Sequence, residues 1–328
     1  MENIKIRNIE IYHGQKVVSN EFYVEHFKKQ GKDVKNFLEK TMGRKFRYEI
    51  DNDVENSLTM AIESSQKVLK ESNLTGKDID VIIYSGMLPE YVSPTAALII
   101  HNAIQGKEEC FCNDINVNCI GMTYSLDFIN RYMSSNPKVK RALLVGSDYL
   151  RIQVSPNNEG CYGQYGDISC ALILEKTDED CKLIETKIAV NNSFINYVRY
   201  PKCGFSNIYN ADKEDMYVDW KPFGAWWIEG AVKNINSMLD KNGLTKDDIS
   251  MFCFSQIAEK NIEILREKLD ISQEKSLYVG DKYGYTGTTS PFIVLYEGVK
   301  NGQIKRGDYL IFSTVAAGST HISVLIKY

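Results

Sequence analysis

The chain has 328 residues, 43% of them hydrophobic and 25% charged, with a formal net charge of −4. This composition is sufficient for a sizeable core, and the charge includes no basic block of the kind that binds nucleic acid. The longest apolar run, at residues 96–100, is far shorter than the ~18 residues that a membrane span needs, and no signal-peptide pattern opens the chain. We therefore expect a cytoplasmic protein that binds neither nucleic acid nor membrane.

The eight cysteines have irregular spacings, and only Cys110 and Cys112 are close neighbours. A CxC pair is a weak metal signal, and no histidine lies near it in the sequence. We expect no metal, and we interpret every thiol except that of Cys119 as a reduced, buried small hydrophobe.

Apolar periodicity and turn residues predict alternating elements in the first half of the chain. These are a helix at 53–72, a strand at 80–85, a helix at 94–105, a strand at 113–118, a helix at 121–134 and a strand at 141–147. Such alternation is typical of βαβ units around a mostly parallel sheet.

The second half repeats this order after an irregular stretch at 191–222, which we expect to shape a substrate entrance. The predicted elements are a helix at 223–241, a strand at 250–255, a helix at 257–269, a strand at 276–280, a helix at 288–301 and strands at 308–314 and 320–327.

An internal repeat links the two halves, since residues 68–86 align with 238–256 at an offset of 170. The identical pairs are Leu69/Leu239, Leu74/Leu244, Thr75/Thr245, Asp78/Asp248, Ile79/Ile249 and Ser85/Ser255. The apolar runs at 142–147 and 309–314 form a second pair at an offset of 167. We predict an N-terminal half over residues 1–175 and a C-terminal half of the same fold over 176–328.

The segment DINVNCIGMTYSLDFINRYM at 114–133 predicts a strand that ends at Asn118 and Cys119, followed at once by a helix. The amides and dipole at a helix N-terminus can lower a thiol pKa from ~8.5 to ~3.5–7.5, and the same amides can hold an oxyanion. Gly121 would let a substrate approach closely. A cysteine at a strand end is also often a packing residue, so the local pattern leaves both interpretations open.

Six segments in sequence order carry a wider resemblance. They are DIDVIIYSGMLPEYVSPTAALI (78–99), NVNCIGM (116–122), ALLVGSD (142–148), QYGDISCALIL (164–174), KYGYTGTTSPF (282–292) and KRGDYLIFSTVAAGSTHISVLI (305–326). Their order and spacing resemble the ketoacyl synthase III (3-oxoacyl-acyl-carrier-protein synthase III) branch of the thiolase superfamily, over nearly the whole chain.

The resemblance implies an α/β fold of five αβαβα layers, built from two pseudo-duplicated halves. It also implies a dimer whose substrate is a CoA or phosphopantetheine thioester, supplied as acyl-CoA or acyl carrier protein, with no permanently bound cofactor. The family's nucleophile lies in the motif that NCIGM matches, so Cys119 inherits that role, and its own backbone amide would serve the oxyanion. The family's glycine-rich loop is altered here to residues 316–318, where the amide of Ala317 is the second oxyanion candidate.

The chain departs from the family at two catalytic positions. Ser255 stands where the family has a histidine, with Gln256 retained beside it, and Tyr285 stands where the family has an asparagine. Both hydroxyls can donate to an enolate, but neither is a general base near neutral pH as imidazole is. His321 is the one histidine placed to substitute, although it could equally satisfy a buried hydrogen bond.

Further substrate contacts follow from the resemblance. Trp220 and Phe223 would border the pantetheine channel, with helix packing as the alternative, and Gln256 is a further candidate. Arg44 lies in a stretch similar to the family's arginine segment that contacts the CoA nucleotide.

These features predict an acyltransferase of fatty-acid-like or specialised metabolism. It would load an acyl group on Cys119 and pass it to an amine, alcohol or carrier thiol. Condensation with Ser255 and Tyr285 as weaker donors is a variant of this hypothesis. The alternative is a non-catalytic subunit that pairs with an active homologue, so that the dimer would be a heterodimer rather than a homodimer.

Overall fold

The computed structural model describes residues 2–221 and 224–328. Its helices are α1 (Asn20–Lys28), α2 (Ser57–Glu71), α3 (Ala96–Ala103), α4 (Gly121–Ser135), α5 (Trp227–Asn242), α6 (Glu259–Leu269), α7 (Gly280–Tyr283) and α8 (Ser290–Lys300). Its strands are β1 (Ile4–His13), β2 (Lys16–Ser19), β3 (Phe46–Glu49), β4 (Val81–Ser85), β5 (Phe111–Asp114), β6 (Arg141–Asp148), β7 (Ile168–Lys176), β8 (Lys182–Val190), β9 (Val198–Arg199), β10 (Asp219–Trp220), β11 (Ile249–Phe254), β12 (Tyr309–Ala316) and β13 (Thr320–Lys327). Among these described segments, none is a helix with the length and apolarity to cross a membrane.

Two sheets of matching topology form the centre of the molecule. The first has the order β1-β7-β6-β4-β5 and the second has the order β8-β13-β12-β11. In the first, β4 runs parallel to β5 and β6, whereas β7 runs antiparallel to β6 and β1. In the second, β11 runs parallel to β12, and β13 runs antiparallel to β12 and β8. Strand order and direction therefore repeat, which confirms the internal duplication.

The prediction of mostly parallel sheets is wrong, because each sheet is mixed. A parallel neighbour requires a crossover connection, usually a helix, whereas an antiparallel neighbour does not. No α-helix separates β6 from β7 or β12 from β13, and both pairs are antiparallel.

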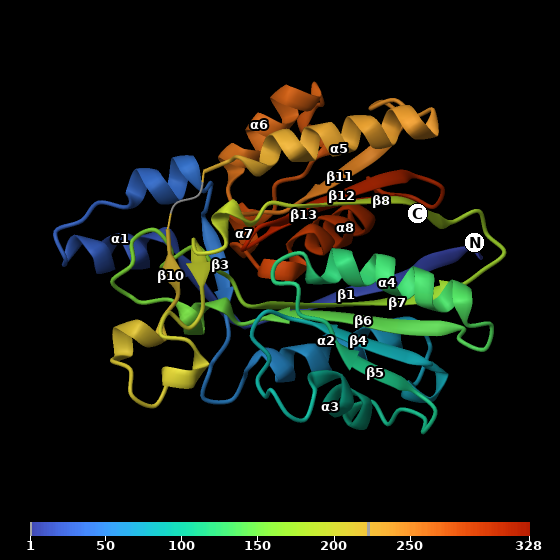
Figure 1. The fold of residues 1–328 in the computed structure, drawn as a ribbon, viewed down its shortest axis with the longest axis horizontal. Coiled ribbons are helices and arrows are strands. Elements are labelled where there is room, and N and C mark those ends of the chain that lie inside the picture. Colours follow the sequence, from blue (N-terminus) through green and yellow to red (C-terminus); the bar gives the residue numbers. More distant parts are fainter. Residues whose placement is uncertain (1, 222–223) are drawn as a thin grey trace.

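Five layers are visible in Figure 1, with α5 and α6 outside the second sheet and α2 and α3 outside the first. Helices α4 and α8 lie between the sheets. The central core packs Ile129 of α4 and Phe292 of α8 against the facing sides of both sheets, with Leu144 on one and Phe312 on the other. The predicted αβαβα fold is confirmed.

The repeat extends to side-chain geometry at the turns that precede β4 in the first half and β11 in the second. The Asp78 carboxylate accepts the backbone N–H and the hydroxyl of Thr75 at 2.8 and 2.9 Å. Asp248 accepts the same two groups of Thr245, both at 2.7 Å. A shared capping geometry explains why these pairs are identical in the sequence.

The strand predicted at 276–280 is absent from the described fold, where residues 276–279 form an irregular segment that leads into α7. Its polar groups are bonded by side chains instead. The carbonyl oxygen of Ser276 accepts from Arg266 at 2.5 Å, and the Val279 N–H donates to the side chain of Gln256 at 2.8 Å. Strand β5 is also shorter than the predicted 113–118, and the predictions include no element before residue 53.

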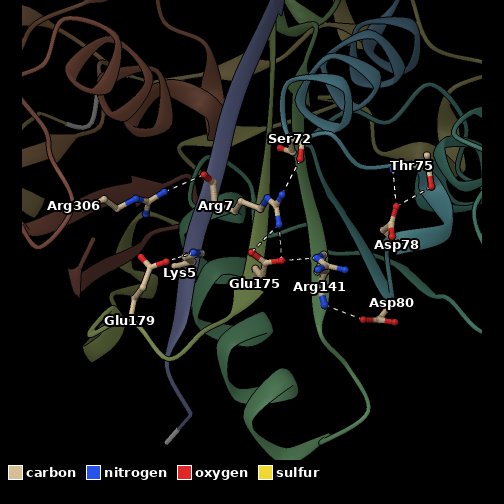
Figure 2. A network of polar contacts seen from close by, with 10 residues as sticks. All are labelled: Lys5, Arg7, Ser72, Thr75, Asp78, Asp80, Arg141, Glu175, Glu179 and Arg306. Atoms are coloured by element: carbon tan, nitrogen blue, oxygen red, sulfur yellow. Dashed lines mark hydrogen bonds and ion pairs between the residues drawn. The ribbon is translucent and has the colours of Figure 1, made fainter.

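Polar contacts join β1 to its neighbours (Figure 2). Arg7 and Arg141 both bind the Glu175 carboxylate, at 2.8 and 2.5 Å. Arg7 also donates to the Ser72 carbonyl at 2.8 Å, and the backbone oxygen of Arg7 accepts from Arg306 at 3.0 Å. This network ties an outer helix end and the C-terminal half to the first sheet.

Candidate active site

Cys119 lies immediately before the central helix α4, whose N-cap is Ile120. The preceding residue, Asn118, has a φ of 52°, a left-handed conformation that asparagine tolerates better than most residues. Its N–H donates to the Asn116 side chain at 3.0 Å, and its carbonyl accepts from Gly121 at 3.0 Å. The predicted position at a helix N-terminus is confirmed, although strand β5 ends earlier than expected.

Gly121 has a different role from the predicted one. A Cβ here would lie 2.0 Å from the Ser85 hydroxyl and 3.2 Å from the Thr288 hydroxyl. The next amide, that of Met122, donates to the Thr288 hydroxyl at 2.6 Å. The prediction that Gly121 opens space for a substrate is wrong, because its missing side chain lets the helix start pack against neighbouring elements.

A narrow, mostly apolar cavity of about 40 Å³ lies beside Cys119. It is lined by Met87, Cys119, Leu150, Gln153, Gln164, Tyr165, Val198, Val218, Trp220, Ile257, Tyr285, Val315, Ala316 and Ala317. Met87, Gln153, Val198 and Ala317 also line a groove of about 620 Å³, so the groove leads to the cavity. The irregular stretch supplies Val198, Val218 and Trp220 to the cavity wall, which agrees with the predicted entrance.

Two backbone amides face the Cys119 sulfur, and both act to lower its pKa. One belongs to Cys119 itself and the other to Ala317, in the loop that follows β12. The structure therefore brings together the nucleophile candidate and both predicted oxyanion donors.

Ser255 and Tyr285 are both buried close to Cys119. The Ser255 N–H donates to Ser313 at 3.1 Å, and the Tyr285 N–H donates to Gln164 at 2.8 Å, which fixes each backbone. The Tyr285 hydroxyl lies close to both the Cys119 thiol and the Ser255 hydroxyl. It lowers the pKa of Cys119, and its own pKa responds to both neighbours. Neither hydroxyl makes a hydrogen bond of normal geometry to the described residues. Tyr285 lines the cavity and Ser255 does not, so the Tyr285 hydroxyl is the one placed to donate to a bound group, with Ser255 beside it.

The pKa of the Cys119 thiol is raised to about 11, chiefly by burial and to a smaller extent by the Asp148 carboxylate. The Tyr285 hydroxyl and the two amides lower it only in part. The prediction of a depressed thiol pKa is therefore wrong, because desolvation of a thiolate outweighs the favourable helix terminus. Near neutral pH the thiol is protonated, and its attack requires the proton to leave.

We expect the rate of Cys119 alkylation by iodoacetamide to rise about tenfold per pH unit over the neutral and mildly alkaline range. The reason is that the thiolate fraction grows by this factor while the pH stays below a pKa of about 11. Intact mass against time measures the rate, with Cys119→Ala identifying modification of other thiols. A plateau near neutral pH would contradict this prediction.

His321 does not line the cavity. Its Nε2 lies 2.9 Å from the Ser313 hydroxyl and its Nδ1 lies 3.3 Å from the Asn234 amide nitrogen. Burial lowers the pKa of His321 to about 4. Both ring nitrogens have partners, so the structure supports the buried hydrogen-bonding alternative, and the described cavity wall contains no imidazole.

Arg44 and Gln256 are buried and bonded within the protein. Arg44 is 1% exposed and donates to the carbonyls of Gln256, Ile257 and Gly280 at 3.1, 2.6 and 3.3 Å. The Gln256 side chain donates to the Phe254 carbonyl at 2.9 Å. Neither side chain lines the cavity beside Cys119, although Arg44 borders a separate pocket of about 410 Å³, so their roles as substrate contacts stay predictions.

Of the predicted aromatic contacts, Trp220 lines the cavity, whereas Phe223 lies outside the described residues. The sequence predictions missed Gln153, Gln164 and Tyr165, which also line it. Gln164 and Tyr165 belong to the matched segment QYGDISCALIL, so a signal for them was present. Gln153 has no comparable signal, because only the tertiary fold directs it inward.

Away from Cys119, the fold gathers a second group of reactive side chains. One ligand atom from each of His101, Cys110 and Cys112 lies within 4.8 Å of the others. No histidine is close to the cysteine pair in the sequence, but the fold brings His101 beside it. Helix α3 packs against β5, and this contact brings residues on different elements together.

Fold and site together define a duplicated five-layer α/β protein with a cysteine at the start of a central helix. The model of the 3-oxoacyl-[acyl-carrier-protein (ACP)] synthase III family matches residues 113–192, and the model of its C-terminal part matches residues 239–328. Together these segments cover just over half of the chain. The chain belongs to the 3-oxoacyl-ACP synthase III family, within the thiolase superfamily.

Relatives agree with this assignment. The chain is 26% identical to a beta-ketoacyl-ACP synthase III of Clostridium perfringens over all of both chains. It is 26% identical to the Aquifex aeolicus enzyme over 273 residues, 82% of this chain and 83% of the relative. A crystal structure of the Aquifex aeolicus synthase aligns with a TM-score of 0.86 at 24% identity, covering 99% of this chain and 100% of that one. A priming beta-ketosynthase of the R1128 polyketide pathway aligns with a TM-score of 0.87 at 16% identity, covering 99% and 96%.

Proposed function

We propose that this protein is an acyltransferase that takes an acyl group from acyl-CoA or acyl-ACP onto Cys119 and passes it to an acceptor. The observation that carries the proposal is the placement of Cys119 at the cavity with the amides of Cys119 and Ala317 beside its sulfur. Family membership supports acyl transfer as the reaction class.

The loading step follows from this geometry. The Cys119 thiol loses its proton, its sulfur bonds to the carbonyl carbon of the donor thioester, and the carbonyl oxygen becomes an oxyanion. The two amides are placed to stabilise that charge. The tetrahedral intermediate then releases the donor sulfur, which takes up a proton, and the acyl group remains on Cys119 as a thioester.

The transfer step has fewer groups available than a decarboxylating synthase would use. Stabilisation of an enolate would fall to the Tyr285 hydroxyl at the cavity, supported by the Ser255 hydroxyl beside it, with no imidazole in the described cavity wall. This favours an amine, alcohol or carrier thiol as acceptor, because attack by such a group needs no decarboxylation. The cavity of about 40 Å³ favours a short acyl group, since each enclosed water needs about 10–15 Å³.

Intact-protein mass spectrometry tests the loading step. The chain is incubated with a panel of acyl-CoA and acyl-ACP thioesters of increasing length, and we expect an adduct from short acyl groups. Cys119→Ala should lose the adduct entirely. Cys203→Ala, which removes another half-buried cysteine, should keep it. An adduct that persists in Cys119→Ala would contradict the proposal.

A second candidate function is a non-catalytic subunit paired with an active homologue. The pKa of about 11 for Cys119 favours it, since a protonated thiol is a poor nucleophile. The same experiment separates the two candidates. No adduct across the panel, even at alkaline pH, would support the partner subunit, and a sizing column with and without the homologue would then show whether a heterodimer forms.

A further inference from the structure

His101, Cys110 and Cys112 form a compact group on the outer side of the first sheet, which we call the cysteine–histidine cluster. His101 lies in the last turn of α3, and the two cysteines flank the start of β5, an edge strand. All three side chains are half-buried, so an ion could reach them from solvent. We propose that this cluster binds a thiophilic metal ion of the zinc class.

The spacing of the sulfurs matches a metal site. The Sγ atoms of Cys110 and Cys112 are 3.9 Å apart. Two thiolates at about 2.3 Å from one tetrahedral zinc ion would be separated by about 3.8 Å. The pair therefore needs almost no adjustment to share an ion. One ring nitrogen of His101 lies within 4.8 Å of both sulfurs, so a small movement completes a three-ligand face.

The imidazole of His101 has one ring nitrogen free to bind a metal. Its Nε2 lies 2.8 Å from the Lys107 carbonyl, which leaves Nδ1 with a free lone pair. Metal-binding histidines commonly donate their other ring N–H to such a carbonyl. Gly106 packs against the Cδ2–Nε2 edge of the ring, where a Cβ would come within 2.3 Å of Cδ2 and 2.4 Å of Nε2. The ring orientation is therefore set before any ion binds.

The donor set determines the class of metal. Two thiolates and one imidazole suit zinc and Cu(I), whereas magnesium and calcium require oxygen ligands. The cysteines bind as thiolates, so each of the two thiols releases its proton when the ion enters. Three protein ligands leave a fourth coordination position for water or an added ligand.

A bound ion would link the edge strand β5 to the last turn of α3. Asp114, at the other end of β5, already holds the start of α3 by accepting the N–H groups of Ala96 and Ala97 at 2.8 and 2.9 Å. The metal would fix the opposite end of the same helix. The chain continues from β5 to Cys119. The bound ion would therefore stabilise the packing of α3 and β5 next to the acyl site, but it would supply no group to that site.

Cobalt titration of the full, reduced and chelator-treated chain tests the proposal. We expect about one equivalent of Co²⁺ to bind, with thiolate-to-cobalt charge-transfer absorption that Zn²⁺ abolishes. The double variant Cys110→Ser/Cys112→Ser should lose this absorption, and His101→Ala should bind at least about tenfold more weakly. Cys203→Ser and Cys119→Ala are matched controls that should keep it. Absent absorption in the unchanged chain, or unaltered binding in the double variant, would overturn the proposal.

Gly106→Ala adds a test that leaves all three ligands in place. The new methyl group should displace the His101 ring and weaken Co²⁺ binding. Zn²⁺ should also stabilise the unchanged chain by a free energy of RT ln(1 + [Zn]/Kd), which raises its thermal midpoint. The thermal midpoint of the double cysteine variant should not change. A Cys110–Cys112 disulfide that forms readily in the presence of Zn²⁺ would instead assign the pair to redox chemistry and overturn the metal site.

Discussion

The double variant Ser255→His/Tyr285→Asn is expected to decarboxylate a malonyl thioester at least about 100-fold faster than the unchanged chain. Loss of CO₂ from malonyl breaks a carbon–carbon bond and leaves an enolate on the thioester. A well-placed donor to such an oxyanion contributes about 10²–10³ in rate. The exchange replaces two hydroxyls with an imidazole and an amide at the positions where the family has histidine and asparagine.

The two substitutions are expected to work as a pair because the side chains are neighbours. Ser255 is 1% exposed, so an imidazole at this position needs new space. The hydroxyl of Tyr285 lies beside Ser255, and the smaller asparagine would vacate that space. Ser255→His alone should therefore lower the thermal midpoint, and Tyr285→Asn should restore much of it. Release of CO₂ from malonyl-CoA or malonyl-ACP measures the decarboxylation rate. A folded double variant whose rate does not exceed that of the unchanged chain would contradict the prediction.

Arg151→Ala is expected to lower the free energy of unfolding by about 3–5 kcal/mol, measured by urea denaturation at neutral pH. Arg151 binds Asp167 at 2.6 Å and Glu49 at 3.3 Å, and both carboxylates are buried. Removing the guanidinium leaves the two buried carboxyl groups without their shared cation. The stretch carrying Arg151 also contributes Leu150 and Gln153 to the cavity wall, so the variant should loosen that wall.

The loss of unfolding free energy in Arg151→Ala should become smaller as the pH falls. Burial raises the pKa of Asp167 to about 6 even with Arg151 present, and without the guanidinium this pKa should rise further. Between the ordinary carboxyl pKa and this raised value, the folded variant binds a proton that the unfolded chain does not, so acid favours the folded state. Arg131→Ala is a matched control, because it removes an exposed pair with Asp127 and should change stability by less than about 1 kcal/mol. Equal losses for both variants would contradict the argument from burial.

The duplicated fold and the position of Cys119 could be predicted from the sequence. Both rest on local patterns. Apolar periodicity marks α4 and the inner strands, and the Thr75/Asp78 and Thr245/Asp248 pairs mark equivalent turns. The ordered segments of a known family added Ala317, whose proposed role depends only on a backbone amide and would therefore survive the change of side chain.

Only the tertiary structure decided the properties that depend on distant neighbours. The thiol pKa of Cys119 is set by desolvation from surrounding elements, which outweighs the local helix terminus. The burial of Arg44 and the contact of His321 with Asn234 likewise come from segments far away in the chain. The antiparallel return of β7 and β13, and the meeting of His101 with Cys110, are also consequences of packing. Local sequence determines where an element forms, but the surroundings of a side chain are known only once the elements are assembled.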